Sequence, residues 1–352
     1  MGVLVIAVGL FAGYGAALLG SREVRYLTRA GFEEIRILKG RRPLDELIRD
    51  PAVDDTTRSL LTLVRDARAY AEALGLDAGE TYTTFSDVGR DTLLLVLSAA
   101  PKDCLCPHTW KYPIVGRIPY KGFFDPRMAE KEAARLETRG YDIHLRPAGA
   151  FSTLGWFNDP LLSTALTRDS MELAATVFHE ISHNTLYVKS ATPFNESFAQ
   201  YAGYRAAEAF FRSRGDTAQA RRAADRWADE QVLGGFYTEL ADRLERFYAT
   251  RPDPARLDSG RAEVAVWSRE QLAGPVGARL RTYRIGPLAD RPVNNARIIG
   301  LRLYRSRLDR FESWHQRYGG DLPAAVRALE DLMQGAEGDQ AFERLAAALR
   351  VS

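Results

Sequence analysis

The sequence has only two cysteines in 352 residues and no excess of charge of either sign. Two cysteines cannot build a disulfide-rich scaffold, a zinc ribbon or a four-cysteine iron–sulfur cluster. The 48 Lys and Arg nearly balance the 46 Asp and Glu. The chain therefore lacks the composition of a basic nucleic-acid-binding protein or of an acidic disordered one, and no nucleic-acid partner is expected. Its length is sufficient for a sizeable hydrophobic core.

Charge is missing altogether from residues 1–20. An uncharged stretch of this length can cross a membrane as a helix or act as an export signal. We expect it to be a membrane anchor or signal segment, with a single domain in residues 21–352. Arg22, Arg25 and Arg29 follow the stretch and no basic residue precedes it, which by charge alone would keep the domain on the cytoplasmic face.

Apolar spacing in the rest of the chain predicts an α+β fold, mostly helical with a small mixed sheet. The sheet-containing part should cover about 80–160 and the helical part about 165–350. Strands are expected at 81–85, 93–97, 141–145 and 150–157. Helices are expected within 22–78 and at 126–139, 171–189, 195–213, 217–250, 261–273, 295–317, 323–333 and 339–350.

The most informative residues are His179-Glu180-Ile181-Ser182-His183, which lie in the predicted helix 171–189. Two histidines four residues apart project from one face of a helix, so both imidazoles can reach the same metal ion. Glu180, next to the first histidine, can take a proton from a water held by that metal. This spacing predicts a zinc site with a general base beside it.

A catalytic zinc needs a third protein ligand. No third histidine follows His183 at metzincin spacing, and the chain instead offers Glu196. Thr192-Pro193 should end the first helix, and Asn195 should cap a second one that turns back and presents Glu196 from its first turn. Small Ala199 would let the two helices approach. We therefore expect His179, His183 and Glu196 to bind Zn²⁺.

The pair of segments HEISH and NESFA resembles the gluzincin metallopeptidases, and the chain as a whole resembles the putative zinc aminopeptidase family of Gram-negative bacteria. Further matching stretches are 41–51, 112–125, 150–166, 177–201 and 294–304. The resemblance implies a gluzincin-like domain, a peptide or protein substrate, and association with the inner membrane, facing the periplasm. Many relatives are lipidated, but Ser21 stands where the acylated cysteine would be.

This resemblance implies zinc-assisted amide hydrolysis with Glu180 as the general base. Tyr304 is the first candidate for a donor that stabilises the oxyanion, and Tyr201 is the second. A strand ahead of the metal helix would pair with the substrate backbone. Alternatively, it would be an ordinary interior strand. The residues concerned are Ser152, Thr153, Leu154, Gly155 and Trp156.

Asn184 and Asn195 are candidates for supporting the metal ligands, although capping alone would explain Asn195. Cys104 and Cys106 are expected to form a disulfide or to remain as two buried thiols, and a disulfide would favour an oxidising compartment. Isolated histidines, at positions 108, 144 and 315, are expected on the surface or in hydrogen bonds.

Two other functions remain open from the sequence: an endopeptidase acting on envelope proteins, and a non-catalytic envelope protein with a structural zinc. Glu180 argues against the second, because a structural site needs no acid beside its ligands. The sequence identifies neither the substrate nor the acid that would bind a substrate's amino group.

Overall fold

The computed structural model describes residues 20–112, 116–149, 160–289 and 292–350. The uncharged segment 1–19 and the predicted strand 150–157 lie outside these ranges. Within them, no helix combines the length and apolar character needed to cross a membrane. The described part of the chain is mostly helical with small sheets, as expected for an α+β fold.

The sheets are short. Strand β3 (Leu94–Pro101) pairs antiparallel with β6 (Lys121–Phe123) on one side and with β7 (Tyr141–Ala148) on the other. A second, mixed sheet joins β1 (Arg41–Pro43), β2 (Thr84–Ser86) and β8 (Leu161–Leu162). Strands β4 (Trp110–Tyr112) and β5 (Gly116–Ile118) form an antiparallel pair.

Strand β1 lies in a region predicted to be helical. Arg41–Pro43 pairs with β2, and helix α3 (Leu44–Arg49) begins only after Pro43. Proline's missing N–H and fixed φ suit the boundary between an extended segment and a first helical turn. The prediction of helices within 22–78 is therefore correct for α3 and wrong for the three residues before it.

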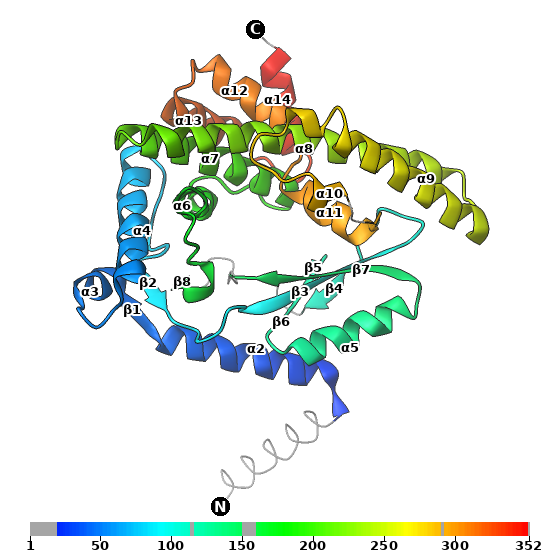
Figure 1. Ribbon diagram of the computed structural model, residues 1–352, viewed down its shortest axis with the longest axis horizontal. Helices are drawn as coiled ribbons and strands as arrows, with labels where there is room; N and C mark the ends of the chain where they lie inside the picture. Colours follow the sequence, from blue (N-terminus) through cyan, green and yellow to red (C-terminus); the bar gives the residue numbers. More distant parts are fainter. Residues whose placement is uncertain (1–19, 113–115, 150–159, 290–291, 351–352) are drawn as a thin grey trace, which may run out of the picture.

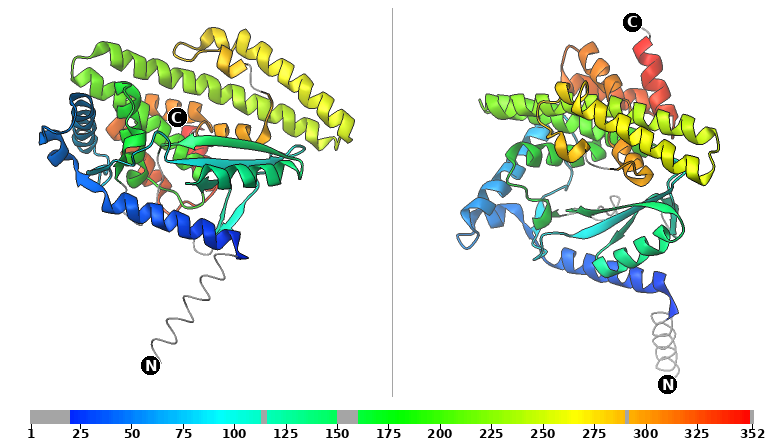
Figure 2. Two further views of the ribbon diagram at one scale, coloured as in Figure 1. Left: turned by 60° about the horizontal axis from the view of Figure 1, so that its bottom comes forward. Right: turned by 45° about the vertical axis from the view of Figure 1, so that its right-hand side comes forward.

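Helix α2 (Arg22–Lys39) and helix α5 (Pro126–Glu137) lie on one side of the β6-β3-β7 sheet, and α11 (Asn295–Leu303) lies on the other. Helix α4 (Asp55–Ala73) stands beside α6 (Ser170–Thr185), which Figure 1 shows end-on. The long helices α7 (Thr192–Ser213) and α8 (Thr217–Ala249) form a hairpin above the sheet (Figures 1 and 2). The remaining helices are α9 (Pro254–Ala273), α10 (Gly286–Ala289), α12 (Leu308–Arg317), α13 (Leu322–Met333) and α14 (Gln340–Arg350).

The largest core cluster surrounds α6 and α7. Eight side chains of α6 are buried, on more than one face of the helix, because α4, α7 and α8 all pack against it. This explains why its sequence is more apolar than a surface helix requires. Helix α6 ends at Thr185, before the predicted end at 189, because Leu186 adopts an extended conformation.

The predicted helix 295–317 is wrong in one respect. It is interrupted between Leu303 and Leu308, where Arg307 takes a left-handed conformation with φ 53°. Nothing local in the sequence marks the break, since a non-glycine residue at positive φ is uncommon. Tyr304 consequently lies in a turn between α11 and α12 and not within a helix.

Candidate metal centre

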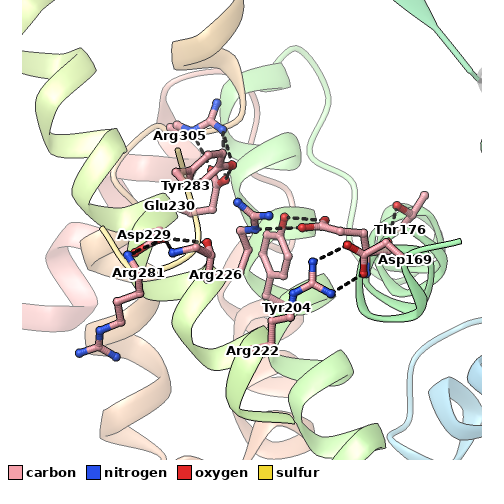
Figure 3. A network of polar contacts seen from close by, with 12 residues as sticks. Asp169, Thr176, Tyr204, Arg222, Arg226, Asp229, Glu230, Arg281, Tyr283 and Arg305 are labelled. Carbon is pink, nitrogen blue, oxygen red and sulfur yellow. Dashed lines mark hydrogen bonds and ion pairs between the residues drawn. The ribbon is translucent and has the colours of Figure 1, made fainter. Parts of the chain in front are cut away.

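Polar contacts with α8 hold the N-terminal half of α6. Asp169 caps α6 by accepting a hydrogen bond from the Glu172 amide and forms an ion pair with Arg222. Arg226 donates to Glu172 at 2.9 Å, and the Tyr204 hydroxyl donates to the same carboxylate at 3.3 Å (Figure 3). Glu172 is seven residues before His179, so these contacts fix the rotation of the face that carries the histidines.

A glycine allows α7 to approach this face. A Cβ atom on Gly203 would lie 2.9 Å from the Ala175 carbonyl oxygen and 3.3 Å from both the backbone nitrogen and Cβ of His179. These separations are shorter than ordinary contacts, so no larger residue fits without moving one helix. Ala199, the small residue noted in the sequence, is also fully buried in α7.

The loop between α6 and α7 is held by a side chain from the first turn of α7. The helix begins at Thr192 with Pro193 in its first turn, so the prediction that Asn195 is the N-cap is wrong. Asn195 is instead buried within the first turn. Its side chain accepts a hydrogen bond from the Val188 N–H at 2.9 Å and donates one to the Val188 carbonyl at 2.8 Å. This double contact holds the loop next to Glu196.

The structure brings together His179 and His183 from α6 and Glu196 from α7. The Glu196 Oε2 atom lies 3.5 Å from His179 Nε2 and 3.8 Å from His183 Nε2. One donor atom from each residue lies within 4.8 Å of the others. Ligand bonds of about 2.1 Å at tetrahedral angles place neighbouring donor atoms roughly 3.4 Å apart. The donor set therefore fits a zinc-sized ion with little adjustment.

The charges at this centre are strongly coupled. Burial acts to lower the pKa of His179, but its hydrogen bond with Glu196 and the charges of Glu180 and Glu196 raise it overall. Burial and the neighbouring His179 lower the pKa of His183 to about 4. Burial acts to raise the pKa of Glu196, but both histidines and Arg146 lower it overall. A neutral His183 and an ionised Glu196 at neutral pH are the forms that bind a metal cation.

Gln200 is a supporting residue that the sequence prediction missed. It lies one turn after Glu196, lines a small cavity together with His179, and its side chain contributes to raising the pKa of the His179 imidazole. Such a contact fixes the orientation of a metal-binding imidazole. Asn184, which was predicted to support the ligands, instead donates to the Asp77 carbonyl at 3.2 Å and to Thr81 Oγ1 at 2.8 Å. It ties the end of α6 to the 77–81 loop.

The two candidate tyrosines lie in different surroundings. The Tyr304 ring centroid is 6.3 Å from that of His179. Burial first, and then the charge of Glu196, raise the pKa of Tyr304, so its hydroxyl keeps its proton and remains a donor. Tyr201 is fully buried in the core and its hydroxyl is 2.9 Å from His315 Nδ1. Tyr201 is therefore occupied elsewhere, whereas Tyr304 borders the histidine pair.

The turn that carries Tyr304 is anchored on both sides. The Ser306 N–H donates to Ser197 Oγ at 3.0 Å, and Ser197 directly follows Glu196. Arg305 Nε lies 2.7 Å from the buried carboxylate of Glu230, which also accepts a hydrogen bond from the Tyr283 hydroxyl (Figure 3). These contacts bind the Tyr304 turn to both α7 and α8.

Two further residues act on the site electrostatically and were not singled out in the sequence. The positive charge of Arg146, on β7, adds to that of the two histidines in lowering the pKa of Glu196 and opposes the overall rise in the pKa of Tyr304. For Tyr120, immediately before β6, partial burial first and then the charge of Glu196 raise the pKa. Both belong to the sheet-containing part of the chain, within β7 and next to β6, where spacing along the chain gives no signal.

The predicted substrate strand, Ser152, Thr153, Leu154, Gly155 and Trp156, lies outside the described residues. The residues that flank it are held together, because Thr164 Oγ1 donates to the Gly149 carbonyl at 2.5 Å.

Cys104 and Cys106 are paired as a disulfide. His108 lies against the Trp110 ring, and His315 bonds to Tyr201, so neither belongs to the metal centre.

Two histidines one turn apart, a glutamate from the adjacent helix and an acid beside the first histidine are the arrangement of a metal-dependent hydrolase. Residues 25–344 match the family model described as "Putative aminopeptidase". The chain belongs to this family, and its membership indicates a peptidase. No curated protein and no solved structure matches the chain.

Proposed function

We propose that this protein is a zinc aminopeptidase that hydrolyses peptide bonds at a gluzincin-type centre. The observation that carries the proposal is the convergence of His179, His183 and Glu196, with Glu180 next to the first histidine. The family match over most of the chain supports the reaction class.

In this proposal each residue has a separate task. His179, His183 and Glu196 hold Zn²⁺, which when bound would acidify a water molecule and polarise the scissile carbonyl. Glu180 accepts the proton of the attacking water and passes it to the leaving amine. Tyr304 donates a hydrogen bond to the oxygen on which negative charge develops. Residues 152–156 would pair with the substrate backbone.

We also propose that the uncharged segment 1–20 associates the protein with the inner membrane and that residues 21–352 form a single domain in the periplasm. The Cys104–Cys106 disulfide supports an oxidising compartment. Arg22, Arg25 and Arg29 favour the opposite face. Accessibility of the domain to protease in intact cells with a permeabilised outer membrane decides between them.

The function is tested by metal analysis together with peptide hydrolysis. We expect one zinc per chain in the wild type and none in His179→Ala. Glu180→Gln should keep its zinc and lose roughly 10³-fold in kcat, because a general base contributes 10²- to 10⁴-fold. Glu343→Gln, an exposed glutamate on α14, is the matched control and should change neither.

Peptides with free and blocked amino termini separate the possible outcomes. Preferential cleavage of free-amine peptides supports an aminopeptidase, and equal cleavage of blocked peptides indicates an endopeptidase. Zinc without any hydrolysis, in wild type as in Glu180→Gln, would leave a structural site and reject the proposal.

A further inference from the structure

The outer face of α2 is unusually apolar for a surface helix. Six large hydrophobic side chains are exposed in the part of the chain that the structure describes, and three of them belong to α2. They are Leu27, Phe32 and Ile35, with exposed fractions of 48%, 61% and 55%. Leu27 and Ile35 are two turns apart and therefore share one face, with Gly31 between them.

The opposite face of α2 is already used in the fold. Glu33 and Ile37 are buried, and the Tyr26 ring packs against Phe123 of β6 at 5.5 Å between centroids. Lys121 of β6 pairs with Glu23 at 2.9 Å. The helix is thus fixed to the sheet by one face, and its apolar outer face is not needed to hold it there. Figures 1 and 2 show α2 along the outer edge of the molecule.

A row of arginines borders this outer face. Arg22, Arg25, Arg29 and Arg36 recur at intervals of three, four and seven residues, which places them along one edge of the helix. Arg29 and Arg36 both share the buried Glu33 carboxylate, which Arg90 also contacts at 3.1 Å. Three guanidinium groups around one carboxylate leave net positive charge at this edge.

An apolar stripe bordered by arginines on a helix fixed to a folded domain is the pattern of helices that lie in a membrane interface. The segment that precedes α2 also indicates a membrane as the partner of this face. Residues 1–20 carry no charge, and Ser21 caps α2 through a hydrogen bond from the Val24 N–H at 3.3 Å. The uncharged sequence therefore leads into the helix without an intervening linker.

We propose that α2 is a membrane-docking surface, with Leu27, Phe32 and Ile35 inserted among lipid chains and the arginine row bound to anionic headgroups. The expected occupant is a bilayer containing acidic phospholipid. Docking would hold the domain with α2 parallel to the membrane and the metal centre on the far side of the sheet. This inference is independent of the proposed peptidase activity.

The test places a fluorescent label on α2 in the full chain. Ile35→Cys is labelled with an environment-sensitive dye, because Cys104 and Cys106 are paired and do not compete. Val266→Cys on α9, at 44% exposure, is the matched control. With vesicles of phosphatidylcholine and phosphatidylglycerol, we expect iodide quenching at position 35 to fall about fivefold and quenching at 266 to stay unchanged.

The headgroup contribution has its own variant. Replacing Arg22 and Arg25 with glutamine should weaken partitioning to acidic vesicles by about fivefold per charge and leave pure phosphatidylcholine binding unchanged. Leu27→Cys repeats the label experiment if Ile35→Cys folds poorly.

Two results would overturn the inference. In the first, vesicle-bound protein leaves the label at 35 as accessible as that at 266, so the uncharged segment alone contacts the membrane. In the second, the label becomes protected without vesicles as protein concentration rises, so the face binds a second copy of the chain. Peptide hydrolysis is measured separately, so its absence would not affect either result.

Discussion

Replacing Gly203 with alanine tests whether the metal centre depends on the close approach of α6 and α7. The added Cβ would lie 2.9 Å from the Ala175 carbonyl oxygen, about 0.5 Å short of an ordinary contact. It would also lie 3.3 Å from the backbone nitrogen and Cβ of His179 itself. The strain therefore acts directly on one ligand, and the helix that must move carries Glu196.

The size of the effect follows from these distances. Metal sites tolerate ligand displacements of about 0.2 Å, and a misplacement of 1 Å at a reacting centre costs about 10²-fold. A shift of about half that size should weaken zinc binding and kcat/KM by about tenfold. Overpacking costs about 1–3 kcal/mol and the helix gains about 0.5–1 kcal/mol from losing a glycine. The net loss of stability should be about 0–2.5 kcal/mol.

Gly235→Ala is the matched control. Gly235 lies within α8, and its Cβ would meet no atom within 4 Å. This variant gains the same helix propensity without a clash, so it should be at least as stable as wild type and bind zinc equally well. The measurements are zinc affinity by competition with a chelator, kcat/KM, and urea unfolding. Wild-type zinc affinity and activity in Gly203→Ala would refute the packing argument.

Three further predictions follow from the contacts at the centre. Tyr304→Phe should lower kcat by about 10²-fold with little change in KM, because only the proposed oxyanion contact is lost, and Tyr201→Phe should leave kcat near wild type. Gln200→Ala should reduce zinc affinity, measured by chelator competition, by about tenfold or more. The zinc-loaded variant should still hydrolyse peptides in a reaction that depends on Glu180. Asp169→Asn tests how much the negative charge of the Asp169 carboxylate stabilises the fold. Burial acts to raise the pKa of Asp169, but Arg222 and the Glu172 amide lower it overall. Its stabilisation is therefore fully present above the ordinary pKa of 3.8 and is lost as the pH falls through the lower pKa of the folded state. The stability gap between wild type and Asp169→Asn, measured by urea unfolding, should therefore close as the pH falls below about 4.

The sequence predicted the parts of the centre that depend on local spacing. His179 and His183 share a face because a helix repeats every 3.6 residues, and the apolar flanks of that helix could be read directly. The sequence also predicted Glu196, because a proline that breaks the first helix and the start of a second helix follow closely after His183. Its neighbour Asn195 was misassigned because a capping residue and a buried loop-binding asparagine look alike in sequence. Only the two hydrogen bonds between the Asn195 side chain and the Val188 backbone, which are seen in the folded protein, distinguish the two roles.

The parts that were missed depend on contacts between distant segments. The break at 304–307 is held by Ser197 and Glu230, which are about a hundred and about seventy-five residues away in the chain. Without those contacts, the apolar spacing of 295–317 favours one continuous helix. Arg146, on β7, and Tyr120, just before β6, belong to segments whose strand register cannot be deduced from either segment alone. Gln200 was the exception, since it is one turn from Glu196 and could have been found by extending the same helical face.

A hydrogen bond joins the Tyr304 turn to α7, the helix that carries Glu196, and it couples the positions of these two residues. Ser197 follows the ligand Glu196 and accepts from Ser306, two residues after Tyr304. A displacement of α7 would therefore move the proposed ligand Glu196 and the proposed donor Tyr304 together, whereas loss of the Arg305–Glu230 ion pair would loosen the turn on its α8 side while leaving the proposed ligands in place. Disturbing α7 should consequently lower zinc affinity and kcat in parallel. Disturbing Glu230 should lower kcat with zinc affinity retained, because in the described part of the chain no hydrogen bond or ion pair joins Arg305 to His179, His183 or Glu196.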